Sequence, residues 1–329
     1  MDEYRQIMDG LTTHKKTILI TGGAGNVGSA LARKLLQNVQ NHVVVVDNLS
    51  TGSRSKLPDV QNTNFTFIHA DVNIRRDMST IMLSHKFDAV FHFAAVVGVQ
   101  RTQQQPIDVL RDIEGFQNLL ELCKNSSVKK VFFSSSSEVY GEPVELPQHE
   151  HHTPLNSRVP YAVVKNVGEC FFKSYQQTYG LPYTIFRFFN TYGPDQSTDF
   201  VVARFLSAAL KNEPITIYGD GSQTRTFTYI DDTVDTCVKI FEHNLLTNDV
   251  INIGNDRILS IKELAELIIS LTKSKSVISY LPPLADGDMS RRQPDNHKMR
   301  TILNRNLIEI EEGIVRMAHD AQFLKHIGL

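Results

Sequence analysis

Short, uninterrupted runs of β-branched and other apolar residues alternate with helix-like stretches over the first half of this chain. One such run is 43–46, four valines in succession, which suits a strand that is buried on both of its sides. Strands of this kind occur in parallel sheets that helices cover on both faces. The pattern therefore predicts an α/β fold with a doubly wound parallel sheet, whose strands lie near residues 17–21, 43–46, 65–69, 89–93, 130–133 and 183–187.

The alternation ends near residue 190, where turn sequences and single helices replace it. One of these helices begins at a capping box, Ser260 with Glu263, and continues in an apolar stripe. We expect three parts: a polar leader over residues 1–15, a dinucleotide-binding domain over 16–185, and a smaller C-terminal region over 186–329 that mostly binds substrate.

Three glycines follow the first apolar run and begin a helix: Gly22, Gly25 and Gly28. At this spacing they allow a tight turn and let backbone N–H groups and the positive helix end approach a diphosphate. Asp47 ends the next predicted strand about 20 residues after Gly28, where a carboxylate binds an adenosine ribose. Because Asp47 and the following Asn48 would not attract a 2′-phosphate, the segment predicts a Rossmann domain that binds NAD rather than NADP.

Tyr161 and Lys165 are four residues apart in a predicted helix, so they share one helix face. A lysine ammonium near a phenol lowers the pKa of the phenol, so that the tyrosinate can take a proton from a hydroxyl group. The serine turn 134–137 follows a predicted strand, at the edge where α/β sheets place their sites. These residues predict an oxidoreductase site in which a serine hydroxyl steadies the substrate oxygen.

Composition excludes several classes of protein. The chain has 329 residues, with 34 Lys and Arg against 36 Asp and Glu, so its net charge is −2. A near-neutral surface without a basic run predicts no nucleic-acid partner, and no apolar run reaches the ~20 residues of a membrane span. The three cysteines (Cys123, Cys170 and Cys237) are too scattered for a disulfide framework or a zinc site. We expect a cytoplasmic protein with no metal and no membrane partner.

Further segments appear in an order that resembles one family, the extended short-chain dehydrogenases/reductases of the nucleotide-sugar epimerase, dehydratase and decarboxylase group. The resemblance spans about residues 16–304 and implies NAD as cofactor, a nucleoside-diphosphate sugar as substrate, and usually a homodimer formed through two helices per subunit. Besides the glycines and the Tyr-x-x-x-Lys pair, the matching segments are Asp71-Val72, Phe93-Ala94-Ala95, the serine turn with 139–141, and residues 187–190, 218–227 and 291–295.

The resemblance also implies roles for single residues. Ser136 would bind the sugar C4 oxygen, Tyr161 would be the base, and Lys165 would orient the nicotinamide ribose. The NAD site would include Gly22, Gly25, Asn26, Val27, Gly28, Asp47, Asn48, Asp71, Val72, Ala94, Ala95, Tyr161 and Lys165. The diphosphate and nucleoside would be held by Asn190, Tyr218, Arg225 and Arg292, since guanidinium groups suit phosphate oxygens.

Ser137 and Glu138 complete the predicted catalytic set and bear on the reaction type. Family dehydratases carry Asp-Glu at this pair, so a 4,6-dehydratase is disfavoured. UDP-glucuronate decarboxylases carry Ser-Glu, as this chain does, and also resemble it near Arg292. The acidic Asp195 after Gly-Pro argues against decarboxylation, because a carboxylate is a poor neighbour for a substrate carboxylate.

Residues 94–101 and 286–292 resemble a branch that includes 4-dehydrogenases of GDP-heptose, used for bacterial surface polysaccharides. We therefore expect oxidation of the C4 hydroxyl of a nucleotide sugar, ending as a 4-ketose or a 4-epimer. Decarboxylation through the same 4-keto intermediate is the alternative, and a non-catalytic dinucleotide-binding regulator is a remote one.

Overall fold

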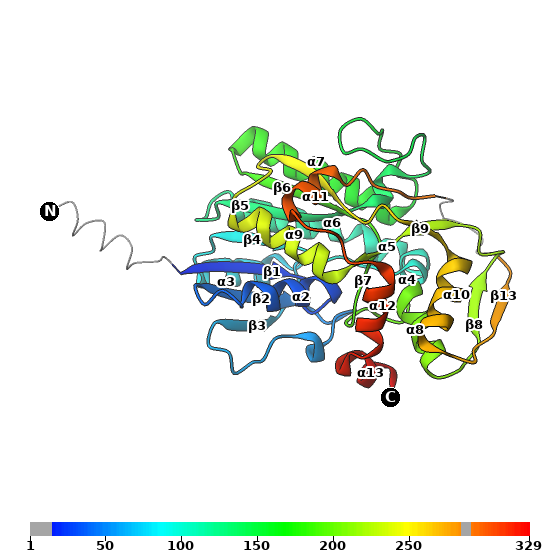
Figure 1. Ribbon diagram of the computed structural model, residues 1–329. Coiled ribbons are helices and arrows are strands. Elements are labelled where there is room, and N and C mark those ends of the chain that lie inside the picture. Colours follow the sequence, from blue (N-terminus) through cyan, green and yellow to red (C-terminus); the bar gives the residue numbers. More distant parts are fainter. Residues whose placement is uncertain (1–14, 284–290) are drawn as a thin grey trace.

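The centre of the molecule is a sheet of seven parallel strands (Figure 1). The computed structural model describes residues 15–283 and 291–329. The topology confirms the predicted doubly wound parallel sheet. Across the sheet the strands are β11 (Asp249–Ile253), β6 (Tyr183–Phe188), β5 (Lys130–Ser136), β4 (Ala89–His92), β1 (Lys16–Thr21), β2 (Asn41–Asp47) and β3 (Phe65–His69).

Burial on both faces explains the uninterrupted apolar runs. On β1 and β2, Ile18 and Val43 point into one core cluster, whereas Leu19 and Val44 point into another on the opposite face. Successive residues of a strand face opposite sides. A polar residue within these runs would therefore be buried whichever side it took.

Helices cover both faces of this sheet. The first face is covered by α2 (Asn26–Leu35) and α9 (Ile230–Glu242). The second is covered by α3 (Arg75–Ser84), α6 (Asp112–Cys123) and α7 (Pro160–Tyr179). Two short helices, α4 (Val99–Gln104) and α5 (Pro106–Leu110), precede α6, and Arg111 separates α5 from α6.

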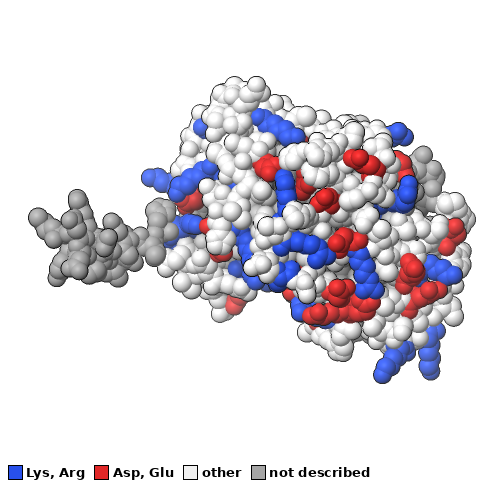
Figure 2. Space-filling model, turned by 45° about the horizontal axis from the view of Figure 1, so that its top comes forward, with Lys and Arg blue, Asp and Glu red and all other residues white. Residues whose placement is uncertain are grey.

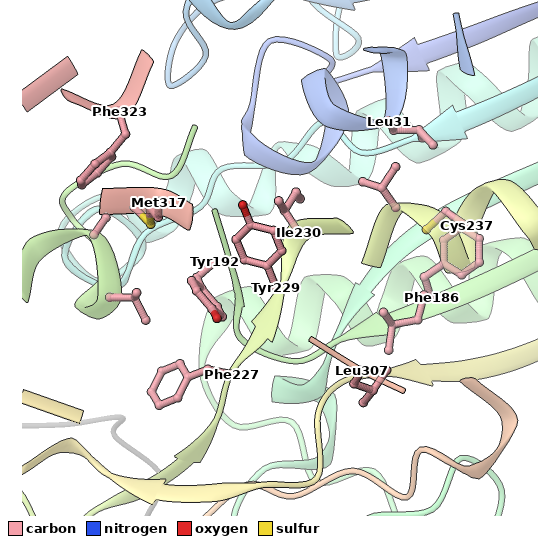
Figure 3. Packing of buried hydrophobic residues seen from close by; sticks show 14 of the residues in the cluster. Leu31, Phe186, Tyr192, Phe227, Tyr229, Ile230, Cys237, Leu307, Met317 and Phe323 are labelled. Carbon is pink, nitrogen blue, oxygen red and sulfur yellow. The ribbon is translucent and has the colours of Figure 1, made fainter. Parts of the chain in front are cut away.

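The C-terminal region packs beside the large sheet and shares its core. Figure 3 shows Tyr192, Tyr229 and Met317 in the same apolar cluster as Leu31 of α2 and Phe186 of β6. Three two-stranded sheets build the region: β7 (Thr191–Tyr192) with β10 (Thr228–Tyr229), β9 (Thr224–Thr226) with β12 (Ile258–Ser260), and β8 (Ile215–Tyr218) with β13 (Ile278–Leu281). Its helices are α8 (Val201–Leu210), α10 (Ile261–Thr272), α11 (His297–Leu303), α12 (Ile310–Ala318) and α13 (Ala321–Ile327).

Two elements that follow the predicted boundary at residue 185 belong to the large sheet and the helices that cover it. Strand β11 and helix α9 belong to the large sheet and its first covering layer, although both come from the C-terminal part of the sequence. The predicted capping box is present, since Ser260 and Glu263 bond each other's backbone amides at the start of α10. Of the predicted polar leader, residues 1–14 lie outside the described residues.

Charges of both signs are interspersed on the face shown in Figure 2. Cys123 and Cys237 are buried and Cys170 is exposed, all three as free thiols. Within residues 15–283 and 291–329, no helix combines the length and the apolar character needed to cross a membrane.

Candidate active site

The turn after β1 brings two backbone segments together without side chains between them. Gly22 has φ +70°, and a Cβ there would lie 2.4 Å from the Ala94 amide nitrogen, in the segment after β4. At Gly28, a Cβ would lie 2.4 Å from the Gly22 carbonyl oxygen. Gly25 is the N-cap of α2 and has no side chain to bond the first amides of the helix. The first turn of α2 therefore opens toward the edge of the sheet with its N–H groups uncapped by a side chain.

Acidic and amide side chains follow β2 and β3 at the same edge. Asp47 accepts hydrogen bonds from the Ala24 amide at 2.9 Å and from the Leu49 amide at 2.7 Å. The Asn48 side chain donates to Asp71 Oδ2 at 3.0 Å. These contacts bring the carboxylates of Asp47 and Asp71 to the tips of neighbouring strands, beside the glycine turn.

The residues at this edge fit an NAD molecule. Asn26 Oδ1 is buried and has no hydrogen-bond partner among the described residues, and the uncapped α2 amides suit a diphosphate. Val72 is 8% exposed, and its carbonyl accepts a hydrogen bond from the Asn118 side chain at 3.2 Å. The ends of four neighbouring strands, the segments that follow them and the first turn of α2 supply the predicted set Gly22, Gly25, Asn26, Val27, Gly28, Asp47, Asn48, Asp71, Val72, Ala94 and Ala95.

Ser136 and Tyr161 meet at the end of β5. The Ser136 hydroxyl oxygen caps the short 3₁₀ helix η2 (Ser137–Tyr140) by accepting from the Glu138 amide at 3.2 Å. The same side chain lies close to the Tyr161 phenol of α7 and acts to lower the pKa of that phenol. Ser137 is 1% exposed and points away from solvent. The structure thus joins two of the predicted catalytic residues across separate elements.

Lys165 lies one helical turn beyond Tyr161 and is almost fully buried. Its ammonium donates to the Ser134 carbonyl at 2.7 Å and to the Ser134 hydroxyl at 3.3 Å. The nitrogen lies 5.7 Å from the centre of the Tyr161 ring. Burial lowers the pKa of Lys165 to about 8, although the charge of Asp112 acts to raise it.

The pKa of Tyr161 differs in direction from the sequence-based expectation. Burial raises the pKa of the phenol, and the charges of Glu138 and Asp112 raise it further. The Ser136 side chain and the charge of Arg292 act in the opposite direction on the pKa of Tyr161. Lys165 was expected to lower this pKa, but removal of the phenolate from water outweighs the nearby cations.

Glu138 and Arg292 form an ion pair beside the phenol. Arg292 Nη2 lies 3.5 Å from Glu138 Oε1, and Arg292 is only 8% exposed. Its Nε is buried and has no hydrogen-bond partner within the described part of the chain. Arg292 therefore keeps an unused donor close to the catalytic group.

The other predicted substrate residues form a second group, near β8 and β9. The Asn190 side chain donates to the Thr226 carbonyl at 3.2 Å, next to Arg225. Arg225 is buried and donates to the Thr224 carbonyl at 2.7 Å. The ring of Tyr218 lies 5.7 Å from the Arg204 guanidinium.

Asp195 does not act as the sequence suggested. It is 4% exposed, and its carboxylate accepts from Arg33 and from Ser29 of α2. The other oxygen accepts from the Gln322 side chain of α13 at 2.6 Å. Because this carboxylate is fully engaged between two helices, the argument that it would repel a substrate carboxylate is wrong.

Asp112 was missed from the sequence. This carboxylate is 7% exposed and influences the pKa values of both Lys165 and Tyr161. Asp112 could have been identified in the sequence as an acidic residue on the buried face of a helix, one turn before Phe116.

The described residues contain no group of three or more His, Cys, Asp or Glu side chains that could hold a metal ion.

Comparison with known proteins gives consistent matches. A model of the NAD dependent epimerase/dehydratase family matches residues 18–254. A UDP-N-acetyl-alpha-D-glucosaminuronate decarboxylase of Bacillus cytotoxicus is 35% identical over 87% of this chain and 91% of its own. The crystal structure of UDP-glucose 4-epimerase with UDP-glucose from Thermotoga maritima is 33% identical, with a TM-score of 0.87 over 94% of this chain and 99% of that one. UDP-glucuronic acid 4-epimerase from Bacillus cereus, in complex with UDP-glucuronic acid and NAD, is 31% identical with a TM-score of 0.84, over 94% and 99% of the two chains.

Proposed function

Because the chain belongs to the NAD-dependent epimerase/dehydratase family, we propose that it oxidises the C4 hydroxyl of a nucleoside-diphosphate sugar and yields a 4-ketose or a 4-epimer. The chain is an NAD-dependent enzyme of the nucleotide-sugar epimerase and decarboxylase group, so the alternative of a non-catalytic regulator is not retained. We place its product among the sugars made for surface polysaccharides, as the resemblance to that branch implies. Residues 286–290 of the second segment on which that resemblance rests lie outside the described residues.

One observation carries this proposal. Ser136 ends β5 and lies close enough to the Tyr161 phenol to lower its pKa, and the Lys165 nitrogen lies 5.7 Å from the centre of the Tyr161 ring. In parallel α/β sheets, ligands bind at this end of the strands. A serine, a tyrosine and a lysine in this arrangement can hold a sugar hydroxyl and remove its proton.

Tyr161, Ser136 and Lys165 have distinct tasks in the proposed reaction. The Tyr161 phenolate takes the C4 hydroxyl proton, and the Ser136 hydroxyl donates a hydrogen bond to the C4 oxygen. Lys165 binds the nicotinamide ribose and contributes positive charge near the phenol. NAD, when bound, supplies a positively charged ring that accepts the C4 hydride and, in an epimerase or decarboxylase, returns it. The residues that would hold it are the glycine turn, the first turn of α2, and Asp47 with its neighbours.

The substrate nucleotide would lie along the second group of residues. Arg225 and Arg292 carry charge that suits diphosphate oxygens, and the unused Nε of Arg292 is a donor available for one of them. Asn190 is adjacent to Arg225, and Tyr218 offers an aromatic ring for the nucleoside. The family expectation of a homodimer through two helices per subunit stays a prediction.

Replacing Tyr161 by Phe tests the assignment of the base. The variant Tyr161→Phe keeps the ring but loses the group that takes the proton, so we expect turnover to fall by about 10²–10⁴-fold. NAD binding should be unchanged, as measured by titration calorimetry. The matched control is Tyr179→Phe, at the exposed end of the same helix, which should turn over at the wild-type rate. Turnover near wild type in Tyr161→Phe would show that another group is the base.

A decarboxylase is the second candidate, and the pair Glu138–Arg292 favours it. Both residues lie beside the phenol, where an acid and a cation could act on a substrate carboxylate. Since Asp195 is held between α2 and α13, the main objection to a uronate substrate no longer applies. Oxidation at C4 of a uronate gives a β-keto acid, which loses carbon dioxide readily.

A panel of nucleoside-diphosphate sugars separates these products. The purified enzyme is mixed with each sugar while the absorbance of reduced nicotinamide and the product mass are recorded. A product two hydrogens lighter, with accumulating NADH, identifies a 4-dehydrogenase. An unchanged mass with a new sugar identifies a 4-epimerase, and loss of carbon dioxide identifies a decarboxylase. No response to any sugar would overturn the proposed function.

A further inference from the structure

An amide side chain of β11 holds together two segments beside the candidate active site. Asn252 is fully buried, and its Nδ2 donates to the Gln148 carbonyl at 2.8 Å and to the Asp295 carbonyl at 3.3 Å. Gln148 and Asp295 also bond each other, because the Asp295 amide donates to the Gln148 carbonyl at 2.8 Å. A further bond runs from the Gln148 amide to the Gln293 carbonyl at 2.8 Å. Asn252 thus lies where the loop after η2 meets the segment that follows Arg292.

The phenol of Tyr140 determines which way this amide points. Tyr140 is the last residue of η2 and donates to Asn252 Oδ1 at 2.7 Å. Burial raises the pKa of Tyr140 to about 12, so the phenol is protonated at neutral pH and remains a donor. Its oxygen accepts in turn from Arg187 Nη1 of β6 at 2.9 Å. Because the Asn252 oxygen accepts from the phenol, the NH₂ group of the same amide faces the two carbonyl oxygens.

Glu138 and Arg292 lie on the two segments that Asn252 ties together. Glu138 belongs to η2, as Tyr140 does, and Arg292 directly precedes the bonded segment 293–295. Among the residues that the structure describes, the Arg292 side chain has its ion pair with Glu138 at 3.5 Å and a buried Nε without a partner. The position of the guanidinium therefore depends on the backbone that Asn252 holds.

We propose that Asn252, oriented by Tyr140, is a positioning residue that holds Arg292 where its guanidinium can bind the diphosphate of the substrate. This inference rests on the proposed function for the role of Arg292. A guanidinium binds phosphate well when its planar donors are aimed at the oxygens, so a displaced backbone weakens the contact although the charge is still present. Asn252 does not touch the substrate in this arrangement. Its loss should weaken diphosphate binding only through Arg292.

The variant Asn252→Ala removes both donors, and titration calorimetry with UDP and with GDP measures the consequence. For the nucleoside diphosphate that the wild-type protein binds, we expect the Kd to rise about tenfold, as for the loss of a hydrogen bond to a charged group. The affinity for NAD should be unchanged, because the predicted NAD residues follow other strands of the sheet.

A double-mutant cycle with Arg292→Ala separates positioning from support of the fold. In the Arg292→Ala background, Asn252→Ala should change the Kd by less than about twofold, because the group through which it acts is gone. A residue that only supported the fold would weaken binding by the same factor in both backgrounds. If Asn252→Ala unfolds, Tyr140→Phe is the milder variant, since it keeps the ring but lets the Asn252 amide turn, and the same cycle applies to it.

The matched control is Tyr192→Phe, which removes another buried phenol hydroxyl, bonded to the Ile310 carbonyl at 3.4 Å. This variant should lower the stability of the protein without changing the Kd. An unchanged Kd in Asn252→Ala, or an equal rise of the Kd with and without the Arg292 side chain, would overturn the proposal.

A second readout needs no ligand. Nitrogen-15 labelling of arginine lets NMR follow the Nε–H group of Arg292, with its signal assigned by its loss in Arg292→Lys. This nitrogen is buried in the wild-type protein, so its hydrogen should exchange with water about tenfold faster in Asn252→Ala. Unchanged exchange would contradict the positioning role. If the wild-type protein binds neither UDP nor GDP and converts no nucleotide sugar, the proposed function fails, and the exchange rate still decides whether Asn252 positions Arg292.

Discussion

Gly28 is a position in the glycine turn where a side chain has no room. It occupies the first turn of α2, and a Cβ there would come within 2.4 Å of a backbone oxygen and 2.7 Å of the Gly23 Cα. Backbone atoms cannot move aside as the end of a flexible side chain can. The turn that would hold the diphosphate therefore depends on the lack of a side chain at this position.

Replacing Gly28 by Ala should displace the turn from α2. We expect the affinity for NAD to fall at least tenfold, about 1.4 kcal/mol, and the protein to lose about 1–3 kcal/mol of stability through overpacking. Titration calorimetry with NAD and urea unfolding measure the two effects. Gly25→Ala is the comparison, because a Cβ there lies 3.3 Å from the nearest atom and should cost less. Equal losses in the two variants would show that crowding at Gly28 is not the cause.

Helix α7 carries both the predicted catalytic pair and a structural ion pair on successive turns. Glu169 follows Lys165 by one turn and accepts from Arg187 of β6 at 2.8 Å and 2.7 Å. Both side chains are buried, and Ser135 of β5 donates to the same carboxylate at 2.7 Å. The helix that positions Tyr161 is thus fixed to two strands by one carboxylate.

Glu169→Gln should destabilise the protein in a pH-dependent way. Burial opposes ionisation of Glu169, but the hydrogen bonds and charge of Arg187 hold its pKa below the ordinary value. A lowered carboxyl pKa contributes stability above the ordinary value of about 4.3, and this contribution is lost as the pH falls through the native pKa. At pH 7 the variant should lose about 3–5 kcal/mol, because Arg187 stays buried without its partner.

Urea unfolding at several pH values measures this loss. The difference between wild type and Glu169→Gln should shrink as the solution becomes more acidic than about pH 4.3. The control is Glu266→Gln on α10, whose carboxylate is exposed and 3.9 Å from Lys262, and which should change stability little. A difference that is constant with pH would contradict the assigned role of the Glu169 charge.

At the scale of the whole molecule, Asp195 joins segments that are far apart in the sequence. Its carboxylate bonds Ser29 and Arg33 of the glycine helix and Gln322 of the last helix. Figure 1 shows α13 beside the end of the molecule that carries α2 and β3. The residue thus connects the glycine-turn helix to the C-terminus rather than lining a sugar site.

Asp195→Asn should therefore lower stability without changing the reaction. The side-chain NH₂ group introduced by this change would face the donor groups that now bond the carboxylate. We therefore expect the free energy of unfolding to fall by about 1–3 kcal/mol and the melting temperature to fall by several degrees. The product and the KM for the sugar should stay as in wild type. Asp199→Asn, an exposed change on the same loop, should alter neither. A large change in KM for a uronate substrate in Asp195→Asn would restore the view that Asp195 faces the sugar.

The sequence by itself determined the features that depend on neighbouring residues. Uninterrupted apolar runs such as 43–46 predicted the strands, because burial on both faces removes every polar position. The glycine spacing predicted a turn that opens a helix, and the spacing of Tyr161 and Lys165 put them on one face of α7. These predictions need only local geometry and short-range periodicity.

Only the tertiary structure decided which distant groups meet and what burial does to them. It turned Asp195 toward α2 and α13 and brought β11 back into the large sheet. It also set the direction of the Tyr161 pKa, which burial raises against the expected effect of a nearby lysine. The physical reason is that desolvation and charge act through space, so they depend on packing between elements that no local pattern in the sequence records.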